Sequence, residues 1–125
     1  MLPTGILTVG ILHANNLRDA QTDTQAGIRT LASVLGQKWS VWLYQFEMLA
    51  PFAILLTTVW FGILPMTVLL TLPIAVAVMT LCKQVLRFDG VNTASIATLD
   101  ASTAKTQLMF SLLMVLGLVA GHWLA

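Results

Sequence analysis

The chain has 125 residues, of which 58% are hydrophobic and 9% are charged, and its mean hydropathy is +0.87. Soluble domains carry about 25% charged residues, so this composition excludes an ordinary globular protein and a disordered one, and it indicates a membrane protein. The net charge of +1 offers no basic surface for nucleic acid, and the single cysteine excludes an internal disulfide. At about 20 residues per transmembrane helix, the chain has room for four or five spans.

Apolar segments alternate with charged clusters from the N-terminus onward. The first span is expected at about 2–16 and the second at about 39–61, with a charged motif loop at 17–38 between them. The charge-free run 48–82 is too long for a single crossing of a ~30 Å hydrocarbon core. A turn within this run is therefore expected.

The most favourable place for that turn is 62–65, because a proline at its end suits the first position of a new helix. A third span is then expected at about 65–86. Pro51 in the second span and Pro73 in the third each lack a backbone donor, and each is expected to kink its helix. A second charged loop is expected at 87–102. The last span, at about 103–124, follows a cluster of residues that favour helix N-caps.

Four spans make residues 1–125 one all-α transmembrane bundle with both charged loops on the same side. Every basic residue then falls on that side. They are Arg18, Arg29, Lys38, Lys83, Arg87 and Lys105. The positive-inside rule places these loops in the cytoplasm, or in the equivalent compartment of an organelle. The sequence thus predicts an integral protein of a bacterial inner membrane or an organelle membrane.

Carboxylates at the end of the first span form the most informative pattern. Asp19 and Asp23 are four residues apart, so on a helix their side chains lie on one face, and Asn15 lies four residues before them on the same face. Two carboxylates and an amide oxygen at a membrane surface suit Mg²⁺, which usually completes its shell with substrate phosphates. The pattern predicts a magnesium site that accepts a diphosphate.

Basic and amide side chains beside this pattern could hold the phosphate oxygens. Arg18 or Arg29 could clamp them directly, and Asn16 lies next to the same stripe. The alternative interpretation is a hydrated loop in which Arg18, Asp19 and Asp23 form surface pairs. The position at a membrane end and the flanking asparagines favour the binding site.

Three other polar residues are weaker candidates. His13 is a lone histidine in an apolar helix, for which packing is the commoner role and catalysis the alternative. Glu47 lies about two turns inside the second span, where it could face an aqueous cavity, pair with Lys83, or contact a partner subunit; a helix–helix or subunit contact is favoured. Lys83 is expected to reach toward lipid phosphates, with a diphosphate contact as the alternative.

A pair of small residues in the last span, Gly117 and Gly121, is spaced so that another helix could approach closely. With eight glycines in the chain, this signal has low specificity.

The segment around the paired carboxylates resembles the second aspartate motif of the UbiA-type aromatic prenyltransferases. The matching residues are Ile11-Leu12-His13-Ala14-Asn15-Asn16-Leu17-Arg18-Asp19, Asp23, Ala26-Gly27, Thr30-Leu31-Ala32 and Leu35-Gly36. Within that superfamily the chain is most similar to the MenA branch, which prenylates 1,4-dihydroxy-2-naphthoate for menaquinone and includes an animal relative that makes vitamin K₂. The resemblance extends to Leu43-Tyr44, Pro51-Phe52 and Thr103-Ala104-Lys105, and so covers nearly the whole chain.

The resemblance implies a bundle of about nine transmembrane helices that binds a polyprenyl diphosphate through Mg²⁺ held between two aspartate-rich motifs, one in each half. This chain would correspond to the C-terminal half. Asp19 and Asp23 would be the Mg²⁺–diphosphate ligands, Asn15 and Asn16 would support them, and Arg18 would contact phosphate. The allylic cation formed would then be attacked by the aromatic acceptor.

The first aspartate motif has no counterpart here, because Glu47, Asp89 and Asp100 do not repeat its spacing. One hypothesis is therefore the C-terminal half of a MenA-like enzyme of menaquinone or quinone synthesis that needs a partner chain with the first motif and is inactive alone. The alternative is a non-catalytic accessory subunit derived from a prenyltransferase, within a larger respiratory or photosynthetic membrane complex. A fragment of a longer enzyme is a third interpretation, in which the family function belongs to the parent protein.

Overall fold

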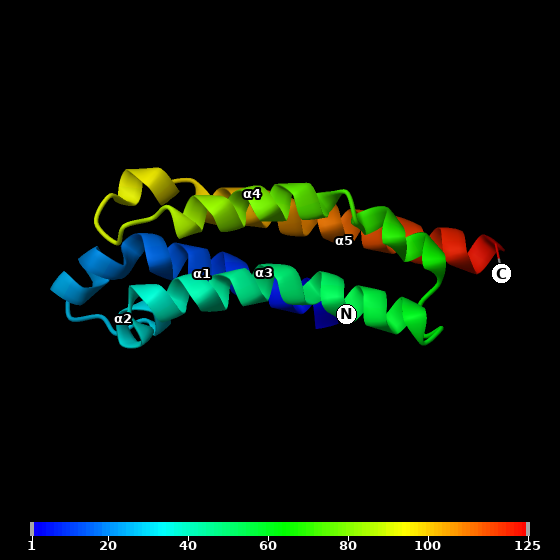
Figure 1. The fold of residues 1–125 in the computed structure, drawn as a ribbon, viewed down its shortest axis with the longest axis horizontal. Helices are drawn as coiled ribbons and strands as arrows, with labels where there is room; N and C mark the ends of the chain where they lie inside the picture. The colour runs from blue at the N-terminus through cyan, green and yellow to red at the C-terminus, as the bar shows by residue number, and fades with distance from the viewer. Residues whose placement is uncertain (1, 125) are drawn as a thin grey trace.

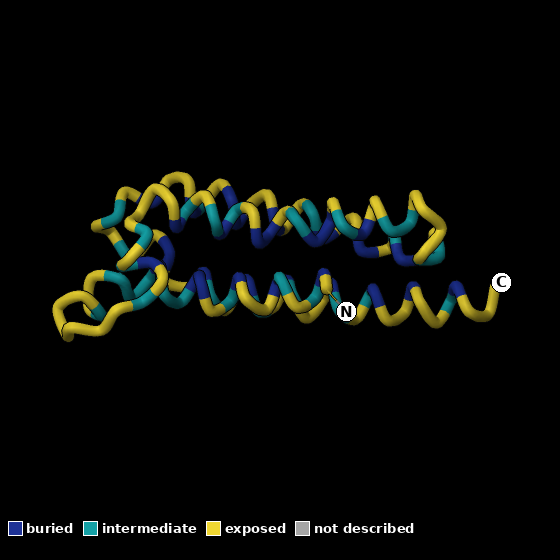
Figure 2. Tube along the Cα trace, turned by 90° about the horizontal axis from the view of Figure 1, so that it is seen from below, coloured by how far each residue is buried: buried dark blue, intermediate teal, exposed yellow. Residues whose placement is uncertain are grey.

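The computed structural model describes residues 2–124, which form α-helices and short 3-10 helices joined by brief connections (Figure 1). In chain order they are α1 (Leu2–Gln25), α2 (Leu31–Leu35), α3 (Gln37–Trp60), η1 (Met66–Thr71), α4 (Ile74–Leu86), η2 (Thr93–Ile96) and α5 (Leu99–Leu124). The predicted all-α fold is confirmed. The helices α1, α3, α4 and α5 form an elongated four-helix bundle in which each packs against two others (Figures 1 and 2).

Both charged connections lie at one end of this bundle. Segments 26–30 and 87–98 meet there, whereas the turn 61–65 and the C-terminal end of α5 lie at the opposite end (Figure 1). The helix α1 begins part-way along the bundle, so that α3 and α5 extend beyond its first turn. The arrangement agrees with the alternation of apolar and charged segments in the sequence.

Buried residues line the inside of the bundle (Figure 2). Many large apolar residues are nevertheless exposed on its outside. The core includes Tyr44, Met48 and Phe110, whereas Trp39 and Leu112 are exposed. Apolar exposure on this scale is unfavourable in water and is normal against lipid or other apolar helices. Two helical segments, Gln37–Trp60 and Thr93–Leu124, are long and apolar enough to cross a membrane, and Ile74–Leu86 is a shorter apolar helix.

Helix boundaries differ from the expected ones at three places. The predicted loop 17–38 is helical as far as Gln25, because no glycine or proline interrupts the chain before Gly27, which has a φ of 72°. The predicted span 65–86 is divided at Pro73 into η1 and α4, because proline cannot donate the backbone hydrogen bond that would join them. The helix α5 begins at Leu99, one turn before the expected start.

The small-residue step on α5 receives another part of this same chain. A Cβ atom at Gly117 would lie 2.7 Å from the Thr67 carbonyl oxygen, and one at Gly121 would lie 2.5 Å from Pro65 Cβ. The Thr67 hydroxyl donates a 2.5 Å hydrogen bond to the Gly117 carbonyl oxygen. The close approach predicted for this step therefore holds η1 against α5 within the chain.

Candidate functional site

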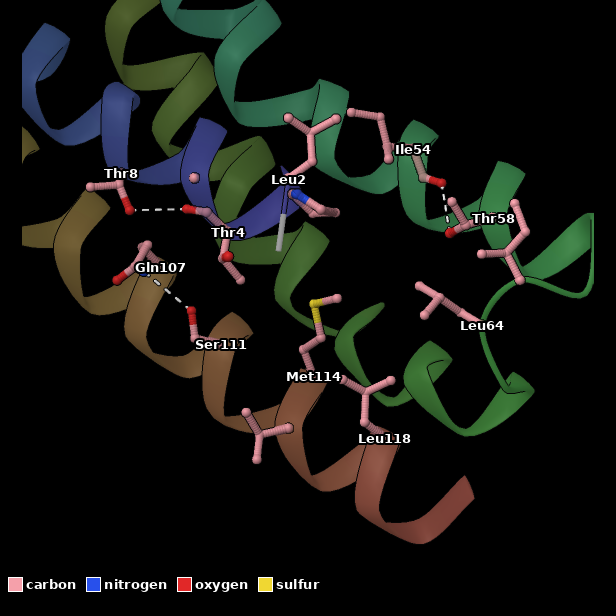
Figure 3. Close-up of a pocket in the computed structure, with 14 residues that line it drawn as sticks. Leu2, Thr4, Thr8, Ile54, Thr58, Leu64, Gln107, Ser111, Met114 and Leu118 are labelled. Carbon is pink, nitrogen blue, oxygen red and sulfur yellow. Dashed lines mark hydrogen bonds between the residues drawn. The ribbon is translucent and has the colours of Figure 1, made fainter. Parts of the chain in front are cut away.

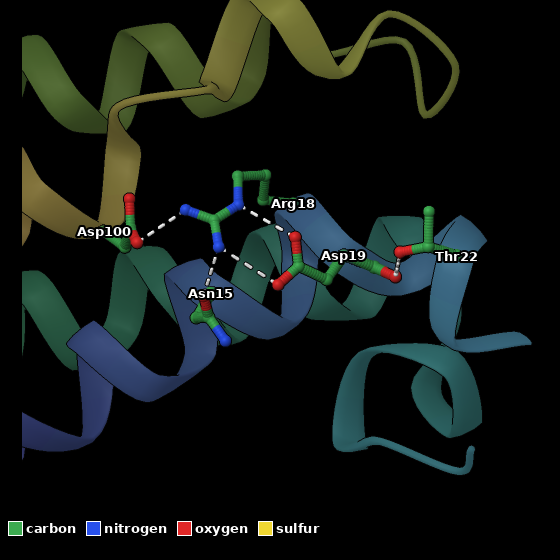
Figure 4. Close-up of polar contacts among 5 residues, drawn as sticks. All are labelled: Asn15, Arg18, Asp19, Thr22 and Asp100. Atoms are coloured by element: carbon green, nitrogen blue, oxygen red, sulfur yellow. Dashed lines mark hydrogen bonds and ion pairs between the residues drawn. The ribbon is translucent and has the colours of Figure 1, made fainter. Parts of the chain in front are cut away.

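The Arg18 guanidinium lies at the centre of a cluster of oxygen atoms near the charged end of the bundle (Figure 4). Its Nε donates to Asp19 Oδ1 at 2.8 Å, and its Nη2 donates to Asp19 Oδ2 at 3.1 Å and to Asn15 Oδ1 at 2.5 Å. Its Nη1 donates to Asp100 Oδ2 at 2.6 Å. We call Asn15, Arg18, Asp19 and Asp100 the Arg18 cluster.

Helical spacing accounts for three members of the Arg18 cluster, since Asn15 lies three residues before Arg18 and four before Asp19 on α1. The fourth, Asp100, lies in the first turn of α5, where the helix dipole favours a carboxylate. Packing of α1 against α5 brings it to Arg18. The side chains of Arg18, Asp19 and Asp100 are 28%, 35% and 26% exposed, so a small polar ligand could reach them.

Hydrogen bonds to Asp19, and then to Asp100, raise the pKa of Arg18 above its already high ordinary value. The guanidinium is therefore charged at every physiological pH. It sits between two carboxylates, which reduces their mutual repulsion and supplies part of the positive charge that a bound cation would otherwise provide.

Other residues predicted for the site lie near the Arg18 cluster without joining it. Asp23 is one helical turn beyond Asp19 and partly exposed, and Asn16 is half-buried on α1. Arg29 is exposed between α1 and α2, and within residues 2–124 the structure gives it no hydrogen bond or ion pair. The roles predicted for these three residues stay predictions.

His13 and Glu47 form a buried pair between α1 and α3. His13 Nδ1 lies 2.9 Å from Glu47 Oε2, and the two residues are 2% and 6% exposed. The His13 ring also meets the edge of Tyr44, with ring centroids 6.4 Å apart. Glu47 therefore makes a helix–helix contact, as expected, but the suggested pairing with Lys83 is wrong.

Lys83 is exposed on α4, where it lines a shallow depression with Arg87 and Ser95. A different depression is lined by Arg18, Asp19 and residues of η2. The structure therefore does not bring Lys83 into the Arg18 cluster.

An apolar cavity of about 630 Å³ lies nearer the opposite end of the bundle, where its lining includes Ile63 and Leu64 of the turn after α3 (Figure 3). It lies between the first turns of α1, the last turns of α3 and the middle of α5, and its lining includes Thr8, Ile54 and Met114. A hydrogen bond of 3.2 Å from Gln107 to Ser111 lies on its α5 wall. The composition of this lining suits a hydrocarbon ligand.

Hard oxygen donors are present at the Arg18 cluster, although no group of three or more His, Cys, Asp or Glu within residues 2–124 could hold a metal ion. Asp19, Asn15 and the neighbouring Asp23 are the donor types that Mg²⁺ takes from protein when phosphates complete its shell. The residues present therefore fit one part of a magnesium–diphosphate site. A Mg²⁺ ion at Asp19 would share the carboxylate with Arg18, because that side chain donates a hydrogen bond to each of its oxygens.

Sequence reasoning missed two of these contacts. Asp100 belongs to the Arg18 cluster, and its place in the charged segment on the same predicted side as Arg18 was a usable signal. The second is the partnership of Glu47 with His13, which are 34 residues apart in the sequence.

Comparison with known proteins agrees with the resemblance found in the sequence. Residues 1–113 match the model of the UbiA prenyltransferase family. The chain is 35% identical to UbiA prenyltransferase domain-containing protein 1 of Xenopus tropicalis over 94% of its own length and 32% of the relative. It is 34% identical to the human protein of that name, over 94% of this chain and 32% of the human protein. It is also 34% identical to the Drosophila melanogaster homolog, over 98% of this chain and 32% of the homolog.

The chain thus spans about a third of the length of the curated relatives it matches. These relatives carry the name of one animal prenyltransferase-domain protein, so they support the superfamily and not the narrower MenA branch. No solved structure matches the chain. The family match and the long apolar helices together indicate a membrane protein, and the chain belongs to the UbiA prenyltransferase family.

Proposed function

We propose that the chain forms the part of a UbiA-type prenyltransferase that binds the diphosphate of a polyprenyl diphosphate, for transfer of the prenyl group to a dihydroxynaphthoate-type aromatic acceptor in menaquinone or quinone synthesis. The observation that carries the proposal is the Arg18 cluster, in which a charged guanidinium lies among oxygen donors near the charged end of the bundle. The cluster lies within the residues that match the UbiA prenyltransferase family. Prenyltransferases of this family generally use Mg²⁺.

The residues of the charged end would stabilise the departing diphosphate. Asp19 and Asp23 would hold Mg²⁺ with support from Asn15 and Asn16, and the ion would supply positive charge to the leaving phosphate oxygens. Arg18 would donate hydrogen bonds to the same oxygens, as guanidinium groups do with phosphate. Positive charge that is already in place beside the leaving diphosphate favours ionisation of the allylic C–O bond.

The apolar cavity is suitably placed for part of the prenyl chain. Thr8, which lines it, is ten residues before Arg18 on α1, so the cavity begins about 15 Å along the helix from the proposed diphosphate site. A polyprenyl diphosphate has a charged head and a long apolar tail, and this arrangement of a polar end and an apolar cavity matches both.

Residues beyond this chain are needed to enclose the substrate, because the chain spans about a third of its relatives. The test is therefore to produce the chain in membranes with and without a polypeptide carrying the N-terminal helices of a relative, and to assay transfer of a radiolabelled prenyl group to dihydroxynaphthoate with Mg²⁺. We expect activity only in the pair. Asp19→Asn should lower the activity of the pair about 100-fold or more, since Asp19 would hold the Mg²⁺ that stabilises the leaving diphosphate.

Asp89→Asn is the matched control for that experiment, because it removes one negative charge from an exposed loop residue and leaves an oxygen acceptor in place. It should retain activity close to that of the unchanged pair. An active pair that is insensitive to Asp19→Asn would contradict the assignment of the site.

A second candidate function is a non-catalytic accessory subunit of a larger membrane complex. It is favoured by the apolar outer face, on which Trp39, Trp42 and Leu112 are exposed, and by Arg18 already neutralising Asp19. If purification from native membranes gives a stable complex with neighbours that contain no aspartate-rich motif, this second function replaces the first.

A further inference from the structure

Asp100 offers Arg18 an anchor that does not depend on the aspartate motif. It comes from α5, 82 residues along the chain, and its Oδ2 accepts a 2.6 Å hydrogen bond from Arg18 Nη1 (Figure 4). The other contacts of the guanidinium use Nε and Nη2, which point to Asp19 and Asn15 on its own helix. The two ends of the guanidinium are thus held by different helices.

A conflict arises when the site takes up a cation. Both oxygens of Asp19 accept hydrogen bonds from Arg18, so a Mg²⁺ ion bound to Asp19 would share this carboxylate with the guanidinium, repel its positive charge and weaken its contact with Asp19. Without another anchor, the released arginine side chain would regain its rotamer freedom and move away from the site. Asp100 prevents this, because its contact uses a different nitrogen.

We infer that Asp100 is a positioning residue that retains the Arg18 guanidinium at the site while its Nε and Nη2 exchange Asp19 for oxygens of the bound diphosphate. This inference rests on the proposed function and adds a residue from α5 to it. Without ligand, Arg18 neutralises Asp19 and Asp100 together. With magnesium diphosphate bound, Asp100 holds the arginine at Nη1 and Asn15 still accepts from Nη2, while the donors freed from Asp19 face the phosphate.

The test uses the chain paired in lipid nanodiscs with the polypeptide that carries the N-terminal helices of a relative, with Mg²⁺ and inorganic diphosphate as the probe. Binding is titrated for the unchanged chain and for Asp19→Asn, Asp100→Asn, Asp100→Glu and Asp89→Asn. We expect Mg²⁺-dependent binding that is lost in Asp19→Asn and weakened about three- to tenfold in Asp100→Asn, as suits a charge-assisted contact that is partly exposed. Asp100→Glu should recover part of the loss, and Asp89→Asn should bind like the unchanged chain.

A spectroscopic measurement separates positioning from general stability. In a ¹⁵N-arginine-labelled sample, the Nε–Hε signal of Arg18 should change on addition of Mg²⁺ and diphosphate and remain visible, because Asp100 still holds the side chain. In Asp100→Asn the same addition should broaden the signal or remove it. A variant that had merely lost stability would alter this signal before the ligand is added.

The two proposals fail in different ways. If the unchanged chain binds and Asp19→Asn does not, but Asp100→Asn behaves like Asp89→Asn in both measurements, the role of Asp100 is wrong and the proposed function stands. If the pair with the unchanged chain shows no Mg²⁺-dependent binding, or the pair with Asp19→Asn binds equally well, both are wrong.

Discussion

The His13–Glu47 contact joins two polar side chains inside the bundle, where each is less than a tenth exposed. Bringing a carboxylate into such surroundings is costly, and the hydrogen bond to the imidazole offsets part of that cost. This hydrogen bond affects stability most when one partner is removed, because the remaining polar group is then buried without a hydrogen-bond partner. Within residues 2–124, His13 Nε2 is already a buried nitrogen without a hydrogen-bond partner.

His13→Ala should therefore lower the free energy of unfolding by about 3–5 kcal/mol, since it leaves the Glu47 carboxylate buried and unpaired. Replacing both residues with leucine should lower it less than the single change does, because no polar group remains to be desolvated. The measurement is denaturant unfolding of the chain in detergent micelles, followed by tryptophan fluorescence. Thr8→Ala serves as the control, since Thr8 is exposed on the same helix.

The single changes His13→Leu and Glu47→Leu complete the cycle, and a double leucine variant as unstable as the sum of these two would contradict this account of the pair. The cycle of single and double changes measures the interaction directly, because the two residues are in contact.

Depth along the helices explains why this partner was missed. Glu47 lies ten residues from the start of α3 and His13 twelve from the end of α1, which places them about 15 and 18 Å from the charged end of the bundle. Lys83 is only three residues from the end of α4, about 5 Å by the same measure. Similar depth in the membrane favours His13 as the partner of Glu47, whereas opposite charge alone favours Lys83.

Asp89 gives a pH dependence outside the membrane-spanning segments. Hydrogen bonds from the backbone N–H groups of Asn92 and Val91 hold the pKa of its carboxyl below the ordinary 3.8. A lowered pKa means that the ionised form stabilises this turn, and that the stabilisation is lost as the pH falls through the lowered value. The amide chemical shifts of Val91 and Asn92 should thus stay constant from about pH 7 and change only below 3.8.

Asp89→Asn should leave these two amide signals independent of pH across the same range, because a side-chain amide does not titrate there. A midpoint above 3.8 in the unchanged chain would show that the two hydrogen bonds do not favour the ionised form.

At the scale of the element, the contact of α5 with η1 depends on the absence of side chains at two positions. A Cβ atom on Gly117 would lie 2.7 Å from both the Thr67 carbonyl oxygen and Val68 Cα, and backbone atoms cannot move aside cheaply. Gly117→Ala should therefore destabilise the chain by about 1–3 kcal/mol, as overpacking does.

Gly5→Ala is the matched control, since a Cβ atom there would meet nothing within 4 Å and alanine favours a helix more than glycine. It should leave stability unchanged or raise it slightly in the same unfolding measurement. A Gly117→Ala variant that is as stable as Gly5→Ala would mean that the close approach of η1 does not require a glycine at position 117.

The helical elements were largely predictable because charges and prolines divide this sequence clearly, as the break at Pro73 illustrates. The helical part of the charged segment, as far as Gln25, was less predictable, because hydropathy marks where a helix leaves lipid and not where it ends. The same extension places Asn15, Arg18 and Asp19 on one continuous helix, which the candidate site requires. The sequence places Asp100 on the same side as Arg18 but does not predict their contact, since that depends on the packing of α1 against α5.

At the scale of the whole molecule, the polar groups and the apolar surfaces are separated along one axis. The Arg18 cluster lies near the end where the charged connections meet, and the apolar cavity lies nearer the other end (Figures 1 and 3). Such a bundle suits a membrane in which one end meets the cytoplasm or an equivalent compartment and the middle meets lipid.

This orientation predicts which side of the membrane each connection faces. In a Cys82→Ala background, which removes the buried native thiol, Ile63→Cys places a thiol in the exposed turn after α3 and Thr98→Cys places one beside the start of α5. With a membrane-impermeant maleimide on intact bacterial spheroplasts, we expect Ile63→Cys to be labelled and Thr98→Cys to be labelled only after permeabilisation, because all basic residues then remain inside. If only Thr98→Cys is labelled from outside, the orientation is wrong and the arrangement of the spans stands. If both cysteines are labelled from outside, the segment between residues 63 and 98 does not cross the membrane, and the arrangement of the spans is wrong as well.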